Sequence, residues 1–392
     1  MSMHADVIVV GAGSVGTMAA WQLAKQGHRV IAVDRSTIPG PFSAYAGESR
    51  LFRTIYREGS HYRGILSRAV SLWRELEEES STDLLRICGG VTIGRRGVPS
   101  FERLLESAQD QDSEFDLLSG DEAAARLPLH RLDEGSLALF DPQSGYLKSE
   151  RAVLSAVQAA QRHGATFLEQ REVNEIVRDG NAWSVHTGQE TLTAPRVIVS
   201  TGTGARQFSR ALGASTEIRP QVLTWFPLRD PAAYASADEQ TIFLRNEPDG
   251  SFYGFPSSDG WTIKVAGSVY LPPVDTYDHP MAVHPEYLDT VTRYVRDYLP
   301  GVEPRAVRVS PCADAYTSDE TALLGEIDGL DGIIAAVGLS GHGFKMAPAL
   351  GAAAADLATG VPVAEDIAFM DPNRFGSPTG STDRLVLSGA PE

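Results

Sequence analysis

The hydrophobic pattern of residues 6–34 changes from a short apolar run to helical spacing and back again. Residues 6–10, DVIVV, form a β-branched run that ends at glycine. Residues 17–28, TMAAWQLAKQGH, have apolar side chains at helical spacing, with Gly27 as a signal for the helix end. Residues 29–34, RVIAVD, form a second apolar run. The pattern predicts a strand, a helix and a second strand, the opening unit of a doubly wound α/β domain.

Two amphipathic helices and a group of short strands are predicted in the rest of the N-terminal half. Between about residues 50 and 79, the apolar spacing around YRGILSRAVSLWRELEEES predicts a helix with charges on its outer face. A loop-rich region is expected to follow. Residues 149–167 predict a second helix that leads into a strand. Residues 172–200 alternate apolar and polar positions around two turns, which predicts a three-stranded meander followed by a buried strand, RVIVS.

The pattern changes again in the C-terminal half. From about residue 217 to 310, strands rich in proline and aromatic residues are predicted, such as VLTWFPL, TIFLRN, SFYGFP and WTIKVAG, with one helix at residues 284–299. Residues 332–338, GIIAAVG, and a helical segment at 349–360 return to the doubly wound pattern. We therefore expect a nucleotide-binding domain in three pieces, 1–85, 140–215 and 318–372, a β domain from 86–139 and 216–317, and a loosely ordered tail at 373–392.

Composition and charge narrow the classes of function. The chain has 392 residues, 42% hydrophobic and 22% charged, as in an ordinary globular protein, and a net charge of -17. This charge disfavours nucleic-acid binding, which needs Lys and Arg to neutralise phosphates, so small-molecule chemistry is expected. Cys88 and Cys312 are too few for a disulfide framework or a cysteine-rich metal site, and no metal ion is expected. No apolar run approaches about 20 residues, so we expect a cytoplasmic protein without a membrane span.

A glycine-rich turn joins the first predicted strand to the first helix. Gly11, Gly13 and Gly16 fit the pattern G-x-G-x-x-G, and Asp34 closes the second strand. In a dinucleotide-binding unit the first glycine turns the chain, the second admits a pyrophosphate, and the third lets helix and strand pack closely, while the acid bonds to ribose hydroxyls. The helix N-terminus adds unpaired N–H groups for the phosphates. The turn by itself leaves open whether the nucleotide is FAD or NAD.

The order of the elements favours FAD. The N-terminal turn, the later meander and the strand that ends in STGTGA, residues 200–205, resemble the glutathione-reductase-type FAD fold. The fold class that this resemblance implies is α/β, with a glutathione-reductase-type FAD-binding Rossmann domain and an inserted mixed, mainly antiparallel β substrate domain.

Four further segments carry a more specific resemblance. They are AGESRLFRTIYREG at residues 46–59, YGFP and IKVAG within residues 253–267, CADAYTSDE at 312–320 and GLSGHGFKMAP at 338–348. Together with the N-terminal turn, they resemble the monomeric sarcosine oxidase and N-methyltryptophan oxidase family of flavoprotein amine oxidases. The resemblance implies covalent FAD, oxidation of the secondary amine of an amino acid, and reduction of O2 to hydrogen peroxide. The partners it implies are an amino-acid-like amine and O2, with the protein a monomer or a weak oligomer.

The resemblance also implies roles for individual side chains. Cys312 falls on the flavin-linking position, Lys264 on the lysine that activates O2, and Arg50 near the flavin ring. Arg53 and Lys345 fall on the pair that holds the substrate carboxylate through a guanidinium fork and a point charge. The residues expected to contact FAD are Gly11, Gly13, Ser14, Val15, Gly16, Asp34, Arg35, Ser49, Arg50, Val173, Thr201, Gly202, Cys312, Gly341, His342, Gly343, Phe344 and Lys345.

Without the resemblance, several of these residues have ordinary alternatives. Cys312 would be a small buried hydrophobe. Lys264 would be a surface lysine, because the alternation of its neighbours does not show which face of the strand is buried. Arg50 and Arg53 lie three positions apart and on a helical turn would share one face, but without the resemblance they would be ordinary surface arginines.

The sequence departs from the family around the expected pocket. Ala46 stands where a histidine is usual, Glu48 where an aspartate is usual and Asp314 where a tyrosine is usual. Ser268 or a neighbour replaces a second histidine. These changes predict a substrate larger or more polar than sarcosine, with Tyr253 and Asp314 at its pocket. Alternatives are a flavin dehydrogenase, an oxidase of cyclic or sugar-modified amino acids, and a flavoprotein subunit of a larger complex.

Overall fold

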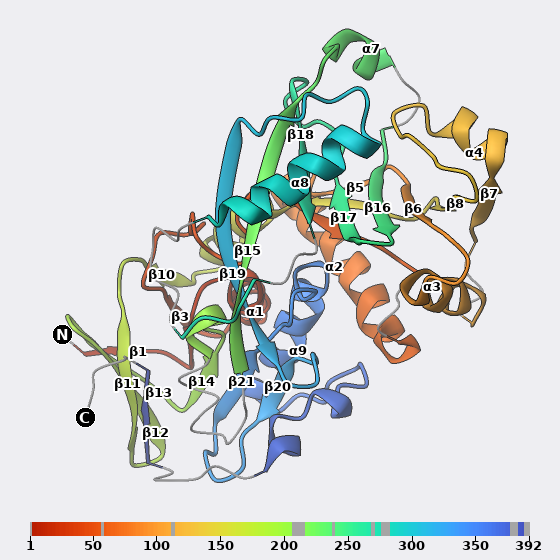
Figure 1. Ribbon diagram of the computed structural model, residues 1–392. Coiled ribbons are helices and arrows are strands. Elements are labelled where there is room, and N and C mark those ends of the chain that lie inside the picture. The colour runs from red at the N-terminus through yellow and green to blue at the C-terminus, as the bar shows by residue number, and fades with distance from the viewer. Residues whose placement is uncertain are drawn as a thin grey trace.

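The computed structural model describes residues 2–55, 59–110, 114–205, 216–236, 240–267, 271–275, 283–376 and 383–387, and its central feature is a six-stranded sheet (Figure 1). β20 pairs antiparallel with its neighbour, and the other pairs are parallel. The sheet order is β10 (Thr166–Leu168), β3 (Val30–Val33), β2 (Val7–Val10), β14 (Arg196–Val199), β21 (Ile333–Val337) and β20 (Leu323–Glu326). The predicted strands at both ends of the chain therefore meet in one doubly wound sheet.

Four helices cover one face of this sheet. They are α1 (Ser14–Lys25), α2 (Arg63–Ser80), α5 (Ser149–Arg162) and α9 (Ala347–Thr359). α1 contacts both α5 and α9, and α2 packs against the same two helices. The prediction of a strand, a helix and a strand over residues 6–34 is confirmed.

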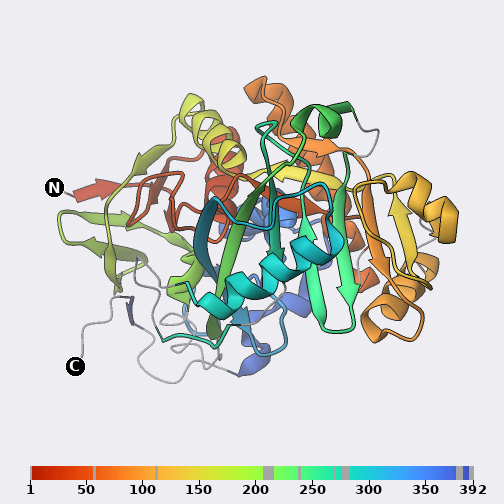
Figure 2. The same cartoon turned by 45° about the horizontal axis from the view of Figure 1, so that its top comes forward.

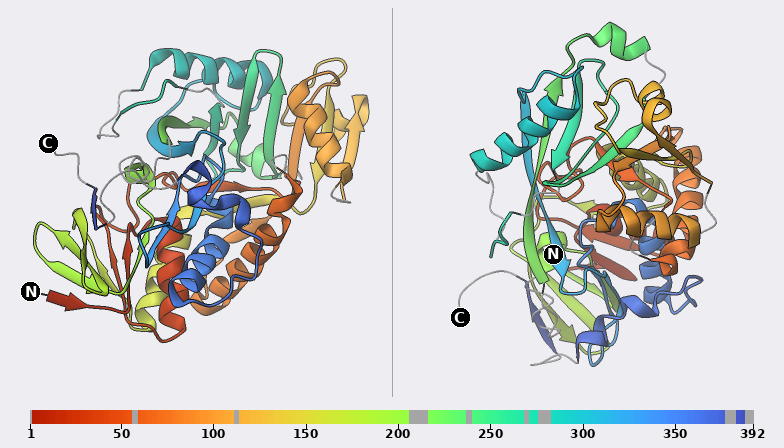
Figure 3. Two further views of the ribbon diagram at one scale, coloured as in Figure 1. Left: turned by 90° about the horizontal axis from the view of Figure 1, so that it is seen from below. Right: turned by 45° about the vertical axis from the view of Figure 1, so that its right-hand side comes forward.

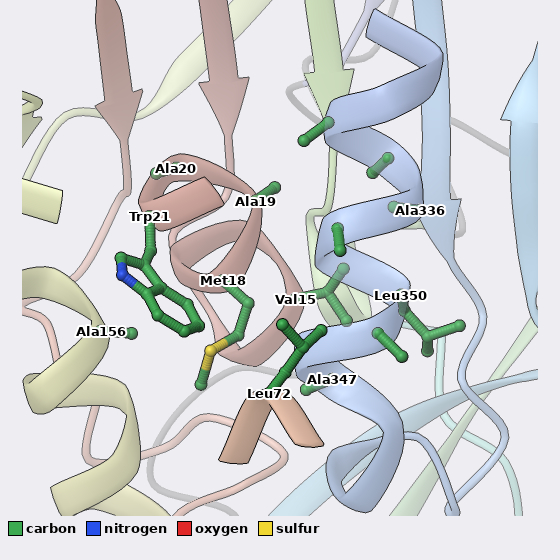
Figure 4. Packing of buried hydrophobic residues seen from close by; sticks show 14 of the residues in the cluster. Val15, Met18, Ala19, Ala20, Trp21, Leu72, Ala156, Ala336, Ala347 and Leu350 are labelled. Atoms are coloured by element: carbon green, nitrogen blue, oxygen red, sulfur yellow. The ribbon is translucent and has the colours of Figure 1, made fainter. Parts of the chain in front are cut away.

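Small side chains allow close packing of these helices. In Figure 4, Trp21 of α1 points toward Ala156 of α5, while Val15 and Leu350 lie between α1 and α9. Gly351 lies at the closest point, because a Cβ there would sit 2.6 Å from the Cβ of Met18. This contact between the first and last helices joins the two ends of the chain.

A second, five-stranded sheet covers the opposite face. Its order is β1 (Ser2–His4), β13 (Thr191–Ala194), β12 (Ala182–Thr187), β11 (Val173–Asp179) and β22 (Arg384–Val386). Strands β11 to β13 form the predicted meander. Alternate residues of β2 point to opposite faces of the sheet. Val7 and Val9 pack in the core on the helix side, whereas Ile8 and Val10 pack in the core on the meander side. The left view of Figure 3 shows the meander and the helices on either side of the six-stranded sheet.

The predicted loose order of the tail is wrong for the residues of β22. This strand pairs antiparallel with β11, and Leu385 and Leu387 are buried. The segment is held by two apolar side chains that reach the meander-side core, which its polar composition does not reveal. Residues 377–382 and 388–392 lie outside the described part of the chain.

An eight-stranded sheet forms most of the rest of the molecule, and its strand pairs are mainly antiparallel, as predicted. The pair between β16 and β6 is parallel. Helix α8 (Pro285–Tyr298) crosses one face of the sheet (Figure 2) and packs against it through Tyr287, Val291, Tyr294 and Val295. The order is β19 (Arg308–Thr317), β15 (Thr216–Pro227), β18 (Thr262–Gly267), β17 (Gly250–Gly254), β16 (Ile242–Glu247), β6 (Gly90–Gly94), β8 (Leu137–Asp141) and β7 (Asp116–Ser119).

Two local predictions between residues 50 and 148 are wrong. The helix expected from about residue 50 begins at Arg63, and Ser49–Phe52 is instead strand β4, which pairs antiparallel with β9 (Gly145–Lys148). Arg50 and Arg53 therefore do not share a helical face. The region expected to be loop-rich contains β5 (Leu85–Ile87), α3 (Pro99–Asp110) and α4 (Gly120–Arg126) in addition to strands of two sheets. These strands are short, and their partners lie far away in sequence.

The remaining helical segments are short. They are α7 (Pro231–Ser236), η1 (Ser60–Tyr62), η2 (Gly202–Gly204), η3 (Phe344–Met346), η4 (Ala368–Met370) and η5 (Pro372–Phe375). Among the helices of the described residues, none has the length and apolar character needed to cross a membrane.

Candidate active site

The glycine-rich turn between β2 and α1 is tightly packed at two of its three glycines. Gly11 has a φ of +93°, and a Cβ there would lie 2.4 Å from the carbonyl oxygen of Ser200. A Cβ on Gly16 would lie 1.9 Å from the carbonyl oxygen of Gly11, so glycine is needed for α1 to approach the strand. A Cβ on Gly13 would meet only the Tyr45 ring within 4 Å, at 3.9 Å. Gly13 thus leaves the backbone open to a ligand, as the pyrophosphate position requires.

Two polar groups beside the turn also fit a dinucleotide. The carboxylate of Asp34, just after β3, accepts the N–H groups of Ala12 and Ser36, each at 2.8 Å. Burial raises the pKa of Asp34, and the two N–H groups oppose the rise. Oγ1 of Thr201, just after β14, is buried and has no hydrogen-bond partner in the described part of the chain. An unpaired hydroxyl at the carboxyl end of a parallel strand fits a polar ligand in the nucleotide crevice.

The other residues predicted on this side lie around the same turn, with one exception. Ser14 and Val15 are the first residues of α1, and Gly202 begins η2. Val173 is buried at the start of β11. The side chain of Arg35 is exposed, and the contacts of all these residues with the cofactor stay predictions.

Residues 44–50, which we call the carbonyl loop, direct main-chain oxygens at two cationic side chains. The guanidinium of Arg50 donates to the carbonyl oxygens of Ser49, Ala44 and Ala46 at 2.7, 2.7 and 2.6 Å. The ammonium of Lys264 donates to the carbonyl oxygens of Gly47 and Ser49 at 2.8 and 2.5 Å. Ser49 thus accepts hydrogen bonds from both cations.

Lys264 is buried inside the molecule and is not a surface residue. Its neighbours on β18, Ile263 and Val265, pack into the core under α8, so Lys264 points to the opposite face of the sheet. Its Nζ lies 4.0 Å from the centroid of the Phe255 ring. Burial, and secondly the charge of Arg50, hold the pKa of Lys264 well below its usual value. Burial therefore favours the neutral amine of Lys264 more than water does, and the negative charges of Glu150 and Glu48 oppose this effect.

Cys312 lies in the same cluster. It is buried on β19 and packs with Leu223, Trp225 and Ala266, with Tyr253 at the edge. Burial raises the pKa of the Cys312 thiol, while the charges of Arg50 and Lys264 lower it. Tyr253 on β17 is affected in the same way, since burial raises its pKa and Arg50 lowers it. Arg50 is the charge that these groups share.

Asp314 lies two residues after Cys312 on β19 and reaches a different main-chain segment. Its carboxylate accepts the N–H groups of Ala315 and Gly341 at 2.8 and 2.9 Å. Burial raises the pKa of Asp314 to about 6, against the opposing effect of these N–H groups and of Arg50. The nearby Arg219 pairs instead with Glu217 and Glu320.

The glycine-rich stretch after β21 forms a turn that leads into α9. Gly341 has a φ of +79°, and a Cβ there would lie 2.2 Å from Oη of Tyr316. Nε2 of His342 lies 3.0 Å from the carbonyl oxygen of Glu320. Phe344 stacks on Trp73 with ring centroids 5.8 Å apart, and the side chain of Lys345 is buried. Nε1 of Trp73 donates to the carbonyl oxygen of Lys345 at 2.9 Å, which fixes the turn against α2.

Arg53 follows β4 and lines a small cavity with Ile55, Asp141 and Ile242. Asp141 accepts hydrogen bonds from Thr54 and Ser144, at 2.8 and 2.5 Å. The sequence prediction for Ser268 concerns a residue outside the described part of the chain.

Two residues of this site were not found from the sequence. Phe255 lies against Lys264, and Glu150 binds the carbonyl loop from the first turn of α5. The position of Glu150 is a signal in the sequence, because an acidic side chain in the first turn of a helix often binds main-chain N–H groups. Nothing in the local pattern indicates which N–H groups it binds.

Comparison with known proteins places this arrangement in a family. Residues 6–357 match the family described as FAD dependent oxidoreductase. Monomeric sarcosine oxidase from Bacillus sp. (strain B-0618) is 31% identical over 379 residues, which cover 95% of this chain and 97% of the relative. N-methyl-L-tryptophan oxidase from Yersinia pestis (strain Pestoides F) is 29% identical over 375 residues, which cover 95% of this chain and 100% of the relative.

Solved structures give the same fold. NikD, described as an unusual amino acid oxidase essential for nikkomycin biosynthesis, superposes with a TM-score of 0.85 at 24% identity, covering 94% of this chain and 98% of NikD. L-proline dehydrogenase from P. horikoshii gives a TM-score of 0.83 at 23% identity, covering 96% of this chain and 98% of that protein. The fold and the glycine-rich turn fit a dinucleotide, and the relatives match over nearly their whole length. The chain therefore belongs to the FAD dependent oxidoreductase family and, within it, to the group of monomeric sarcosine oxidase and N-methyltryptophan oxidase.

Proposed function

We propose that this protein is an oxidase of a secondary or N-substituted amino acid that carries FAD covalently on Cys312 and returns hydrogen peroxide. When bound, FAD supplies the two-electron acceptor that no side chain can provide. The turn at Gly11, Gly13 and Gly16, with Asp34 and Thr201, would hold its nucleotide half. The residues around Lys264 would surround its reactive half. The observation that carries the proposal is the convergence of Lys264, Arg50, Tyr253, Cys312 and Asp314 beside the carbonyl loop.

Cys312 lies beside two buried cations, although burial and the charge of Asp314 keep the pKa of its thiol above the usual value. Burial favours the neutral thiol, but Arg50 and Lys264 act in the opposite sense on its pKa. A thiolate is the nucleophilic form, and nearby cations favour it. Cys88 is also subject to burial, which raises its pKa, but its surroundings include neither of these two cations. We therefore assign covalent attachment to Cys312.

Lys264 is proposed to promote the reaction with O2. Among the described residues its two acceptors are neutral carbonyl oxygens, so no carboxylate there cancels its charge by direct contact. A preorganised cation in a buried site stabilises the negative charge that develops on O2 far better than an exposed lysine does. Arg50 adds a second positive charge within the same cluster.

The substrate carboxylate is assigned to Arg53 and Lys345. A guanidinium and an ammonium on one carboxylate combine a fork geometry with a point charge. The amine has to react in its neutral form, because its lone pair drives electrons out of the C–H bond. Ala46 is smaller than the histidine usual in the family, and this difference favours a substrate with a side chain larger than that of sarcosine.

A panel of N-methyl, cyclic and sugar-modified amino acids tests this function. We expect the purified protein to consume O2 with at least one N-methyl or cyclic amino acid and to release one hydrogen peroxide for each amine oxidised. Turnover with an artificial electron acceptor but not with O2 would make the protein a dehydrogenase. A fully flavinylated protein that oxidises none of the panel would contradict the proposal and favour a subunit that works with a partner.

Asp314 is expected to make substrate recognition depend on pH. Its pKa of about 6 means that the carboxyl group is neutral below that pH and charged above it, whereas an ordinary aspartate is charged from about pH 4 upward. If the substrate carries a second cationic or hydroxyl group, its KM should rise by about tenfold as the pH falls from 7 to 5, because a charge-assisted hydrogen bond is lost. The Asp314→Asn variant should have the high KM at both pH values.

Asp319→Asn is a matched control, because Asp319 lies in the turn after the same strand and pairs with Arg374 at the surface. It should keep the pH dependence of KM. An unchanged ranking of substrates in Asp314→Asn would show that this carboxylate does not face the substrate.

A further inference from the structure

Two peptide groups of the carbonyl loop are bound at both ends by charged side chains. In the first, the carbonyl oxygen of Ala46 accepts from Arg50 at 2.6 Å, and the N–H of Gly47 donates to Oε1 of Glu150 at 2.6 Å. In the second, the carbonyl oxygen of Gly47 accepts from Lys264 at 2.8 Å, and the N–H of Glu48 donates to Oε2 of Glu150 at 2.9 Å. One carboxylate is therefore linked to two cations, each through a single peptide group.

The position of Glu150 favours a charged carboxylate. Glu150 lies in the first turn of α5, where the positive end of the helix stabilises anions. Oγ of Ser149 donates to its Oε2 at 3.0 Å. Burial alone would raise the pKa of Glu150, but the hydrogen bonds from Glu48, Gly47 and Ser149 lower it below the usual value. Glu150 therefore remains negatively charged at neutral pH.

The carbonyl loop needs such a restraint because its backbone conformation is unfavourable. Gly47 has a φ of +103° and Glu48 a φ of +73°, and the second value is in the region that residues with a side chain rarely adopt. The side chain of Glu48 is held on the other side by Nε1 of Trp225 at 3.2 Å and by Arg308. The loop is thus fixed between α5 and the eight-stranded sheet.

Neither cation touches a carboxylate within the described residues, since all acceptors of Arg50 and Lys264 there are carbonyl oxygens. A direct ion pair would cancel charge that the site needs for anionic groups. A counter-charge placed one peptide away orients the carbonyl oxygens and offsets part of the cost of burying two cations. It leaves the remaining face of each cation free of a carboxylate.

We propose that Glu150 is a positioning residue that holds the carbonyl loop with its oxygens toward Lys264 and Arg50, and that it maintains the charge of Lys264 for the reaction with O2. This inference rests on the proposed role of Lys264. The charged groups that act on Lys264 are Arg50, which lowers its pKa, and Glu150, Glu48 and Cys312, which raise it against the larger effect of burial.

The Glu150→Gln variant tests the proposal through two independent readouts. Without the negative charge, the pKa of Lys264 should fall further, so the rate constant for O2 should begin to decline at a lower pH than in the wild type. One unit of such a shift reduces the rate about tenfold at pH values above the wild-type midpoint. The rate of flavin reduction by substrate should change less. In hydrogen–deuterium exchange, peptides that cover residues 44–52 should exchange faster, because the amides of Gly47 and Glu48 then have one neutral oxygen as acceptor in place of two charged ones.

Glu286→Gln is the matched control. Glu286 occupies the same place in the first turn of α8, is exposed, and lies on a helix of the other sheet. It should leave both readouts unchanged. In a Lys264→Met background, Glu150→Gln should lower the O2 rate by no more than about threefold, since coupled residues are not additive.

Three outcomes would overturn the inference. One is an unchanged pH profile together with unchanged exchange in the Glu150→Gln variant. Another is an equal fall of flavin reduction, O2 reaction and melting temperature, which would indicate only a structural role. The third is a full additional loss in the Lys264→Met background. If reduced wild-type enzyme reacts with O2 no faster than free reduced flavin, the proposed oxidase function fails, and the exchange experiment still decides whether Glu150 holds the loop.

Discussion

Replacing Lys264 with Met is expected to slow the reaction of the reduced enzyme with O2 by roughly 10²–10³-fold, the usual effect of removing one preorganised charge-stabilising group. The methionine fills a similar volume but carries no charge, so the negative charge that develops on O2 loses its nearest cation. Reduction of the flavin by substrate should stay within about threefold of the wild type, because Arg53 and Lys345 are assigned to the substrate carboxylate. Stopped-flow measurements of the two half-reactions provide this comparison.

Lys25→Met is a suitable control for the loss of a lysine. Lys25 lies at the end of α1 and pairs with Glu75 at the surface, so its replacement should leave both half-reactions unchanged. The assignment of Lys264 would be wrong if Lys264→Met lowered flavin reduction as much as the O2 reaction, or if it left the O2 reaction unaffected.

Replacing Cys312 with Ser is expected to abolish covalent attachment of the flavin. After acid precipitation, the wild-type pellet should stay yellow, whereas the flavin of Cys312→Ser should pass entirely into the supernatant. The serine hydroxyl is a poor nucleophile at neutral pH, whereas a thiol is intrinsically more nucleophilic, and Arg50 and Lys264 oppose the rise that burial causes in the pKa of Cys312. Before precipitation, the variant should still bind FAD, since Gly13, Asp34 and Thr201 remain in place.

The control for this experiment is Cys88→Ser. Cys88 is half-buried near Tyr146 and Ile242, in a separate apolar cluster. Its pellet should remain yellow. A colourless wild-type pellet would show that the cofactor is not covalently bound, and a yellow Cys312→Ser pellet would assign the link to another residue.

The sequence revealed those parts of the fold in which the determining contacts are local. The strand, helix and strand over residues 6–34 follow from the apolar pattern, and Gly11 and Gly16 are needed because a Cβ there would collide with the main chain of Ser200, just after β14, and of Gly11. The meander could be predicted for the same reason, since each of its strands pairs with the next along the chain.

The failures have a common physical cause. Residues 49–52 read as part of a helix because their local spacing permits it, but their backbone pairs with β9, almost 100 positions away in the sequence. The tail strand β22 pairs with β11 over an even longer separation. Short strands gain most of their stability from partners and from burial, so their sequences carry little independent signal.

For the active site, the residues along the chain show which chemical groups are available and, through the resemblance, to which family they belong. The burial of Lys264 follows from the folded chain alone, because alternation along β18 is the same for either face of the sheet. Folding alone joins Lys264 to Gly47 across 217 positions and Gly47 to Glu150 across 103. Hydrogen bonds of this kind depend on how separate elements pack and not on the neighbouring residues in the sequence. The link from the Glu150 carboxylate through a peptide group to each cation is therefore visible only in the folded chain.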